Sequence, residues 1–262
     1  MTPVDAVLRG VAAVCVITGA LVVAAGPDFP RPATADATQQ VAADSLQRRA
    51  ESRDYTFLLT SPETRLPGRW CGGTIPYHLD LTQAVRAGLD PGAEAARWAA
   101  VMQRWAEASG GYYRFEYAGT RDLRVDSQGE LDLDSIEPGS IGISYVHDDP
   151  TTGEAAYRAA AVVGRTAGNG GLQVTSNAEV PGGMLVGDRG FVMIDADDAA
   201  ELSPTGLREA LYQHESGHAL GLGHVPSGDS IMNGTLSERR LTLTDGDRAG
   251  LRALIEMPCA KP

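Results

Sequence analysis

Three of the five histidines in this chain fall within eleven residues, in the stretch HESGHALGLGH that starts at His214. His214 and His218 are four residues apart, so on a helix their rings lie on the same face, one turn apart. Gly221 follows, and it can adopt the positive φ that ends a helix and turns the chain back. Such a turn would bring His224 to the other two histidines. The spacing therefore predicts a helix that ends at a glycine turn, with three imidazoles facing one point.

Three neutral imidazoles are a typical ligand set for a catalytic zinc ion, because they leave the fourth tetrahedral position open for a water molecule. Glu215 would project from the edge of the same helix face, within reach of that water without ligating the metal. We therefore expect one catalytic Zn²⁺ held by the three histidines, with Glu215 as the general base. Core histidines packed on a helix are the alternative, but chance seldom produces five fixed positions in this arrangement.

The motif continues with SGDSIMNG, in which Met232 comes eight residues after His224. This stretch resembles the metzincin metallopeptidases, and the spacing to the methionine is typical of their matrixin branch, the matrix-metalloproteinase-like enzymes. The resemblance implies that Met232 forms a Met-turn, a hydrophobic floor beneath the ligands. It also implies a zinc-dependent endopeptidase, which hydrolyses the peptide bonds of a protein or peptide substrate by means of a zinc-activated water.

Several positions depart from the pattern of vertebrate-type matrixins. Val225 stands where those enzymes have serine, and Asn233 and Gly234 replace their Tyr-Pro. The region after His147 lacks the second histidine and the glycine-rich loop that bind their structural zinc and calcium, so no motif supports calcium or a second zinc. A metal at His147 and the two aspartates that follow it is less favoured than a solvated turn. A bacterial matrixin-like protein fits these departures best.

The order of the predicted elements favours an α+β fold. Apolar and polar residues alternate from residue 75 to 80, as in a half-buried strand. The apolar residues of AEAARWAAVMQRWAEAS recur at three- and four-residue steps, which indicates an amphipathic helix. Short β-prone runs separated by turn residues fill the middle of the chain. Ser203-Pro204 favours the start of the histidine-bearing helix, and Thr244 with Asp247 resembles a capping box that opens a terminal helix.

The resemblance to the metzincins implies the same class in more detail. It predicts a zincin catalytic domain with a mixed twisted β-sheet, an active-site helix, one further long helix and a C-terminal helix. RWCGGTIPYHLDL is similar to the first strand of matrixin catalytic domains, and LTLTDGDRAGLRALI to their closing helix. In such proteins the substrate lies extended along an edge strand. We expect that strand within residues 164–174 or 180–186, and a pocket wall within residues 233–242.

The N-terminal 35 residues have the pattern of a signal peptide. One arginine precedes an apolar run over residues 11–26, and small residues follow at 33–35, as signal peptidase requires. The run is shorter than the roughly 20 residues that span a bilayer, although an uncleaved N-terminal anchor facing outside stays open. Residues 36–54 are polar and predict a linker or short pro-segment. Residues 55–262 would then form the catalytic domain of a secreted protein.

The charge of the chain bears on its partners. The formal net charge is −12, and no cluster of basic residues provides the face that nucleic acid requires. We therefore expect no nucleic-acid partner, contact with a membrane only if the N-terminal segment stays uncleaved, and a monomer. A non-catalytic exported zinc-binding module for adhesion or interaction is the second candidate function. Glu215 counts against it, because binding alone does not need that carboxylate.

Export would leave Cys71 and Cys259 as the only cysteines of the mature chain, and such a pair in an oxidising compartment favours a disulfide. Cys71-Gly72 also faintly resembles the zinc-blocking cysteine of matrixin pro-segments. However, the flanking arginine and Pro-Asp of that element are missing, and Cys71 comes at the start of the predicted first strand. We favour the disulfide over the blocking thiol.

Overall fold

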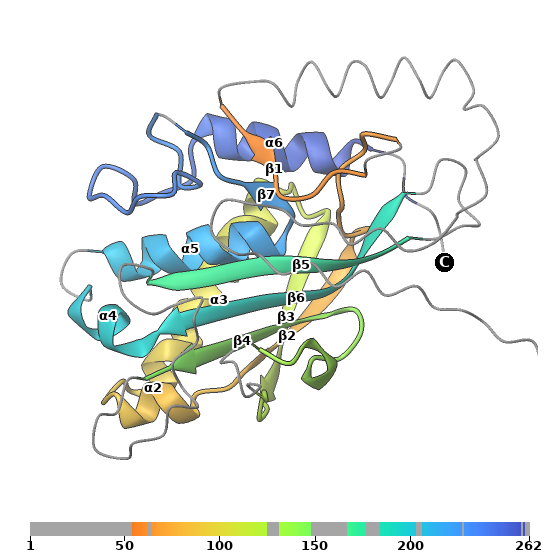
Figure 1. Ribbon diagram of the computed structural model, residues 1–262. Coiled ribbons are helices and arrows are strands. Elements are labelled where there is room, and N and C mark those ends of the chain that lie inside the picture. Colours follow the sequence, from red (N-terminus) through yellow and green to blue (C-terminus); the bar gives the residue numbers. More distant parts are fainter. Residues whose placement is uncertain are drawn as a thin grey trace, which may run out of the picture.

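A five-stranded mixed β-sheet forms the centre of the computed structural model, with the strand order β3-β2-β4-β6-β5 (Figure 1). Strands β3, β2, β4 and β6 run parallel to one another, and β5 is antiparallel to β6 at one edge. The strands are β2 (Gly73–Leu79), β3 (Tyr113–Thr120), β4 (Ser140–Val146), β5 (Gly168–Ser176) and β6 (Leu185–Asp195). The structure describes residues 54–61, 64–124, 131–147, 167–176, 184–202, 206–226, 228–257 and 259.

Two long helices pack on the sheet and on each other. α3 contacts β3, and α5 contacts β5 and β6, while α3 and α5 also touch. A second, two-stranded sheet pairs β1 with β7, and Figure 1 shows it between α5 and α6. The remaining elements are β1 (Thr56–Phe57), α2 (Thr82–Arg86), α3 (Pro91–Ala108), η1 (Leu133–Ser135), α4 (Ala196–Glu201), α5 (Leu207–Ala219), β7 (Leu222–Gly223) and α6 (Asp245–Ile255). The predicted α+β fold, with its mixed sheet and three principal helices, is confirmed.

The predicted strand and helix patterns are present in β2 and α3. In β2, the alternate residues Ile75, Tyr77 and Leu79 are buried, and those between them are half-buried. In α3, the Asp90 side chain accepts from the backbone N–H of Ala93 and so caps the helix start, where backbone donors lack helical partners. The apolar stripe of α3 faces the core, with both of its tryptophans fully buried.

A buried polar network that the sequence did not indicate joins α3, β4 and α5. Glu94 is 1% exposed. Its carboxylate accepts hydrogen bonds from Arg208 Nη1 and from the Tyr145 hydroxyl, each at 2.8 Å, and a third from the Tyr212 hydroxyl. The Trp98 indole donates to Tyr145 and stacks on Tyr212 with ring centroids 4.4 Å apart. An unpaired buried carboxylate is very costly. These partners therefore fix α5 against α3, directly before the histidine motif.

Of the two helix starts predicted from the sequence, the one at Thr244 is confirmed and the one at Ser203 is corrected. α6 begins with the expected capping box, in which Thr244 and Asp247 exchange hydrogen bonds. α5, however, begins at Leu207, and its N-cap is Gly206 rather than Ser203. Gly206 has φ of 76°, a value that glycine adopts without strain, so the chain turns directly into the helix there. Ser203 and its neighbour Pro204 lie outside the described residues.

Several other predictions concern residues outside the described part. The signal peptide and nearly all of the predicted linker fall within residues 1–53 and stay predictions. Within the described residues, no helix has the length and apolarity needed to cross a membrane. The predicted substrate strand at 164–174 overlaps β5, which is one of the two edge strands of the five-stranded sheet. The alternative at 180–186 is wrong where it can be examined, because residues 185–186 belong to β6, which lies between β4 and β5.

Candidate metal centre

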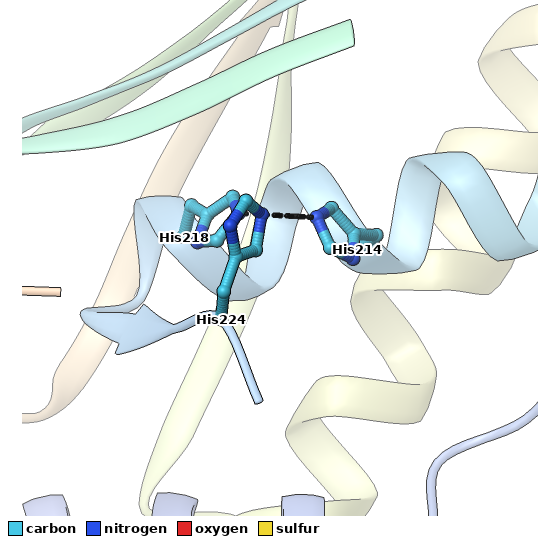
Figure 2. A group of neighbouring side chains, drawn as sticks. All are labelled: His214, His218 and His224. Atoms are coloured by element: carbon cyan, nitrogen blue, oxygen red, sulfur yellow. Dashed lines mark hydrogen bonds between the residues drawn. The ribbon is translucent and has the colours of Figure 1, made fainter. Parts of the chain in front are cut away.

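The three histidines of the motif converge as their spacing predicts. His214 and His218 lie on α5, and His224 follows β7 (Figure 2). The Nε2 atom of His214 is 3.1 Å from Nε2 of both other rings. Each histidine offers one ring nitrogen that lies within 4.8 Å of a ring nitrogen of the other two. No other group of three histidine, cysteine, aspartate or glutamate side chains that could hold a metal ion occurs in the described part of the chain.

Backbone carbonyls orient the two helical rings. His214 Nδ1 is 2.7 Å from the carbonyl oxygen of Ile231, and His218 Nδ1 is 2.7 Å from that of Leu222. Because a carbonyl oxygen can only accept, each Nδ1 carries the hydrogen, and the lone pair of each Nε2 faces the centre of the cluster. Such outer hydrogen bonds are typical of metal-ligating histidines, in which they fix the tautomer and the ring orientation.

The environment favours the neutral form of all three rings. Burial lowers the pKa of His214 to about 4. Burial, with the two neighbouring imidazoles, lowers the pKa of His218 well below its usual value. His224 is more exposed, but partial burial lowers its pKa as well. Neutral imidazole is the form that coordinates a metal ion, so the cluster can accept a cation at neutral pH without first releasing protons.

Glu215 lies on the β5 side of the same helix and is buried. Burial raises the pKa of its carboxyl to about 8, and a hydrogen bond from the backbone N–H of Gly170 acts in the opposite direction. Two glycines of β5 allow this strand to approach Glu215 closely. A Cβ at Gly168 would lie 2.8 Å from the Glu215 side chain, and one at Gly170 would lie 2.1 Å from its carbonyl oxygen. Neither glycine was predicted from the sequence as part of the site, although glycine inside a strand is a known sign of such an approach.

The turn that contains Met232 lies against α5. Met232 is buried, and a Cβ at Gly217 would lie 2.4 Å from its sulfur. Only glycine at this position of the helix therefore leaves room for the methionine. Gly221 has φ of 104°, and α5 ends at Ala219, which is the predicted turn away from the helix. Met232 therefore packs directly against α5, and its role as the floor of the site stays a prediction.

A buried aspartate of α6, predicted from the sequence only as part of a helix cap, also holds this turn. Asp247 is 1% exposed, and its carboxylate accepts from the Ser230 hydroxyl, from the Ile231 N–H at 3.1 Å and from the Thr244 N–H at 2.8 Å. The carbonyl of Ile231 in turn holds the ring of His214. Asp247 therefore connects α6 to His214 through the backbone of a single residue, Ile231.

The other histidines and the cysteines lie apart from this cluster. His147 Nδ1 is 3.0 Å from both carboxylate oxygens of Asp197 on α4, and the aspartates that follow His147 lie outside the described residues. His78 is 3.8 Å from Glu137. Cys71 and Cys259 are positioned as a disulfide pair, with Cα atoms 5.5 Å apart, a usual separation for such a bond. The bond itself stays a prediction for the exported protein.

Comparisons with known proteins point to one family. Residues 159–256 match the model of the Matrixin family of peptidases, and this segment contains the three histidines, Glu215 and Met232. No curated protein matches the chain. The family match, the α+β fold and the histidine cluster together support a matrixin-like metallopeptidase.

Proposed function

We propose that this protein is an exported zinc-dependent endopeptidase. In this proposal His214, His218 and His224 hold the catalytic zinc, and Glu215 transfers protons. The observation that carries the proposal is the geometry of the histidine cluster. The Nε2 atoms face one point, and backbone carbonyls hold the Nδ1 atoms of the two helical rings.

The donor set fits zinc better than a hard cation. Three neutral nitrogen ligands suit a borderline-soft ion, whereas calcium and magnesium prefer oxygen ligands. Three protein ligands also leave a position open, as in catalytic rather than structural zinc sites. When bound, zinc would supply a Lewis acid that polarises the scissile carbonyl and lowers the pKa of a water molecule.

Glu215 is the residue best placed to move the proton. Its carboxyl is buried beside the histidines, and without a cation that burial holds its pKa at about 8. A nearby divalent cation favours the ionised carboxylate, which is the form that acts as a base. The Gly170 N–H orients this carboxylate. Glu215 would accept a proton from the attacking water and deliver it to the leaving amine.

The substrate would be an extended segment of a protein or peptide. Strand β5 forms an edge of the sheet, with β6 on one side, and it passes directly over Glu215. An open strand edge offers backbone donors and acceptors to an added strand. On the other side of the site, Gln213 Nε2 donates to the Leu241 carbonyl at 3.3 Å and holds the predicted pocket wall, residues 233–242, against α5.

Hydrolysis of a mixed peptide library by the purified protein tests this proposal. We expect cleavage inside the peptides, loss of cleavage when a zinc chelator is added, and recovery when zinc is restored. Zinc binding without cleavage of any peptide would favour the second candidate, a non-catalytic exported zinc-binding module. Cleavage that persists after complete removal of metal would contradict both.

Export is tested separately by the mass of the mature protein. We expect residues 1–35 to be missing from the protein recovered outside the cell. Recovery of the full chain in the membrane fraction would support the N-terminal anchor instead. Either result leaves the chemistry of the site unaffected.

A further inference from the structure

We propose that the N-terminal strand β1 is a positioning element of the metal centre, which holds two of its three ligands in place through β7. This inference rests on the proposed function, because it assigns β1 a role in zinc binding. It concerns residues that lie far from the histidine motif in the sequence. Thr56 and His224 are 168 residues apart.

Strand β1 and the residue after it contact every residue from Gly221 to His224. Thr56 pairs with Gly223 and Phe57 with Leu222 in an antiparallel arrangement. The contacts continue beyond the pair on both sides. The N–H of Leu58 donates to the Gly221 carbonyl at 2.8 Å, and the Thr56 hydroxyl donates to the His224 carbonyl at 2.7 Å.

The segment that β1 contacts positions two of the three histidines, His218 and His224. The carbonyl of Leu222 orients the His218 ring, so any movement of β7 would turn that ring. The main chain of His224 is held directly by Thr56. No carbonyl in the described part of the chain accepts from Nδ1 of His224, in contrast to the other two rings. The position of His224 therefore depends on its backbone, and β1 fixes that backbone.

The approach of β1 to β7 is close enough to require glycine. A Cβ at Gly223 would lie 2.7 Å from the carbonyl oxygen of Phe57 and 2.7 Å from the Thr56 hydroxyl. This contact accounts for the second glycine of the LGLGH sequence, which neither the metal ligands nor the helix end explains.

The residue before β1 is anchored on the opposite side. Tyr55 is 7% exposed, and a Cβ at Gly250 of α6 would lie 2.8 Å from the Cβ of Tyr55. The segment from Tyr55 to Leu58 thus lies between α6 and β7 as a fixed part of the domain. Proteolytic processing that removed Thr56 would remove the contact to His224, whereas processing before Tyr55 would keep it.

Two variants of the full chain test the role of β1. Thr56→Val keeps the shape of the side chain and removes only the hydrogen bond to His224, and we expect about a tenfold loss of zinc affinity, as for other outer partners of metal ligands. Gly223→Ala forces β1 away from β7, and we expect a loss of roughly tenfold to a hundredfold. Thr60→Val is the matched control, because Thr60 is exposed in the same N-terminal segment and lies outside the β1–β7 pair.

Zinc affinity is measured by competition with a chelator, and amide hydrogen exchange of Leu58 in the zinc-free protein reports the docking of β1. We expect Thr56→Val to bind zinc more weakly than Thr60→Val, and Leu58 to exchange faster in Gly223→Ala. Wild-type zinc affinity in both folded variants would overturn the inference, as would an unprotected Leu58 amide in the wild-type protein. Absence of peptide cleavage by a wild type that binds zinc would count only against the proposed function.

Discussion

The two ends of the metal centre are built differently. His214 and His218 lie within one helix, each is 6% exposed, and each ring is held by a backbone carbonyl. His224 lies beyond the glycine turn, is exposed, and is held through its main chain by Thr56. The first pair is therefore set by helix geometry and burial, whereas the position of the third histidine depends on a contact with the other end of the domain.

The largest effect on bound zinc is expected from the buried end of the site. His218→Ala removes a ligand and leaves the Leu222 carbonyl without its donor, so we expect zinc affinity to fall by more than about a hundredfold, beyond the loss typical of outer partners. The zinc-free protein should also lose about 1–3 kcal/mol of stability. Metal analysis at neutral pH and denaturant unfolding measure both. His78→Ala, outside the cluster, is the control, and one zinc per chain in His218→Ala would refute the assignment.

The exposed end should respond differently. His224→Ala also removes a ligand, and we expect about a hundredfold loss of zinc affinity, since all three imidazoles are needed for a stable site. The stability of the zinc-free protein should stay within about 0.5 kcal/mol of wild type, as for other surface substitutions. If His224→Ala retains a full zinc ion, the third ligand lies elsewhere, and the difference between the two ends disappears.

A smaller effect is expected from the residue that supports His214 indirectly. Asp247→Asn replaces a carboxylate that only accepts with an amide that presents N–H groups to the donors of Ser230 and Ile231. We expect about a tenfold loss of zinc affinity, because the Ile231 carbonyl would shift. Asp245→Asn, at an exposed position of the same helix turn, should bind zinc as the wild type does. Equal zinc affinity in the two variants would show that the position of His214 does not depend on Asp247.

The smallest effect on zinc is expected from the cysteines, which are not part of the histidine cluster. Replacing Cys71 and Cys259 by serine opens a loop of 188 residues, which the chain-entropy model values at about 5 kcal/mol of stability, less any strain. The folded variant should bind zinc normally. Mass spectrometry of the unreduced exported protein checks the bond, and two free thiols there, or activity that rises on Cys71→Ser, would revive the zinc-blocking role.

The sequence predicted the features that follow from local periodicity. The spacing of His214 and His218 requires only a helix, and the capping box at Thr244 requires only four adjacent residues. The hydrogen bonds of Glu94 with Tyr145 and Arg208, and that of Thr56 with His224, join residues more than 45 positions apart. Their pairing depends on the packed fold, and no local pattern specifies it. The glycines of β5 form a visible cluster in the sequence. Their role, which is to leave room for Glu215, becomes apparent only when the position of Glu215 in the fold is known.

The central claim is that the three histidines hold the metal and Glu215 performs the proton transfer. Zinc content and peptide hydrolysis, measured on one preparation of Glu215→Ala beside the wild type, test it most directly. The account predicts one zinc per chain in both proteins and at least about a hundredfold slower hydrolysis by the variant, as is usual when a general base is removed. Loss of zinc from Glu215→Ala, or hydrolysis at the wild-type rate, would contradict it.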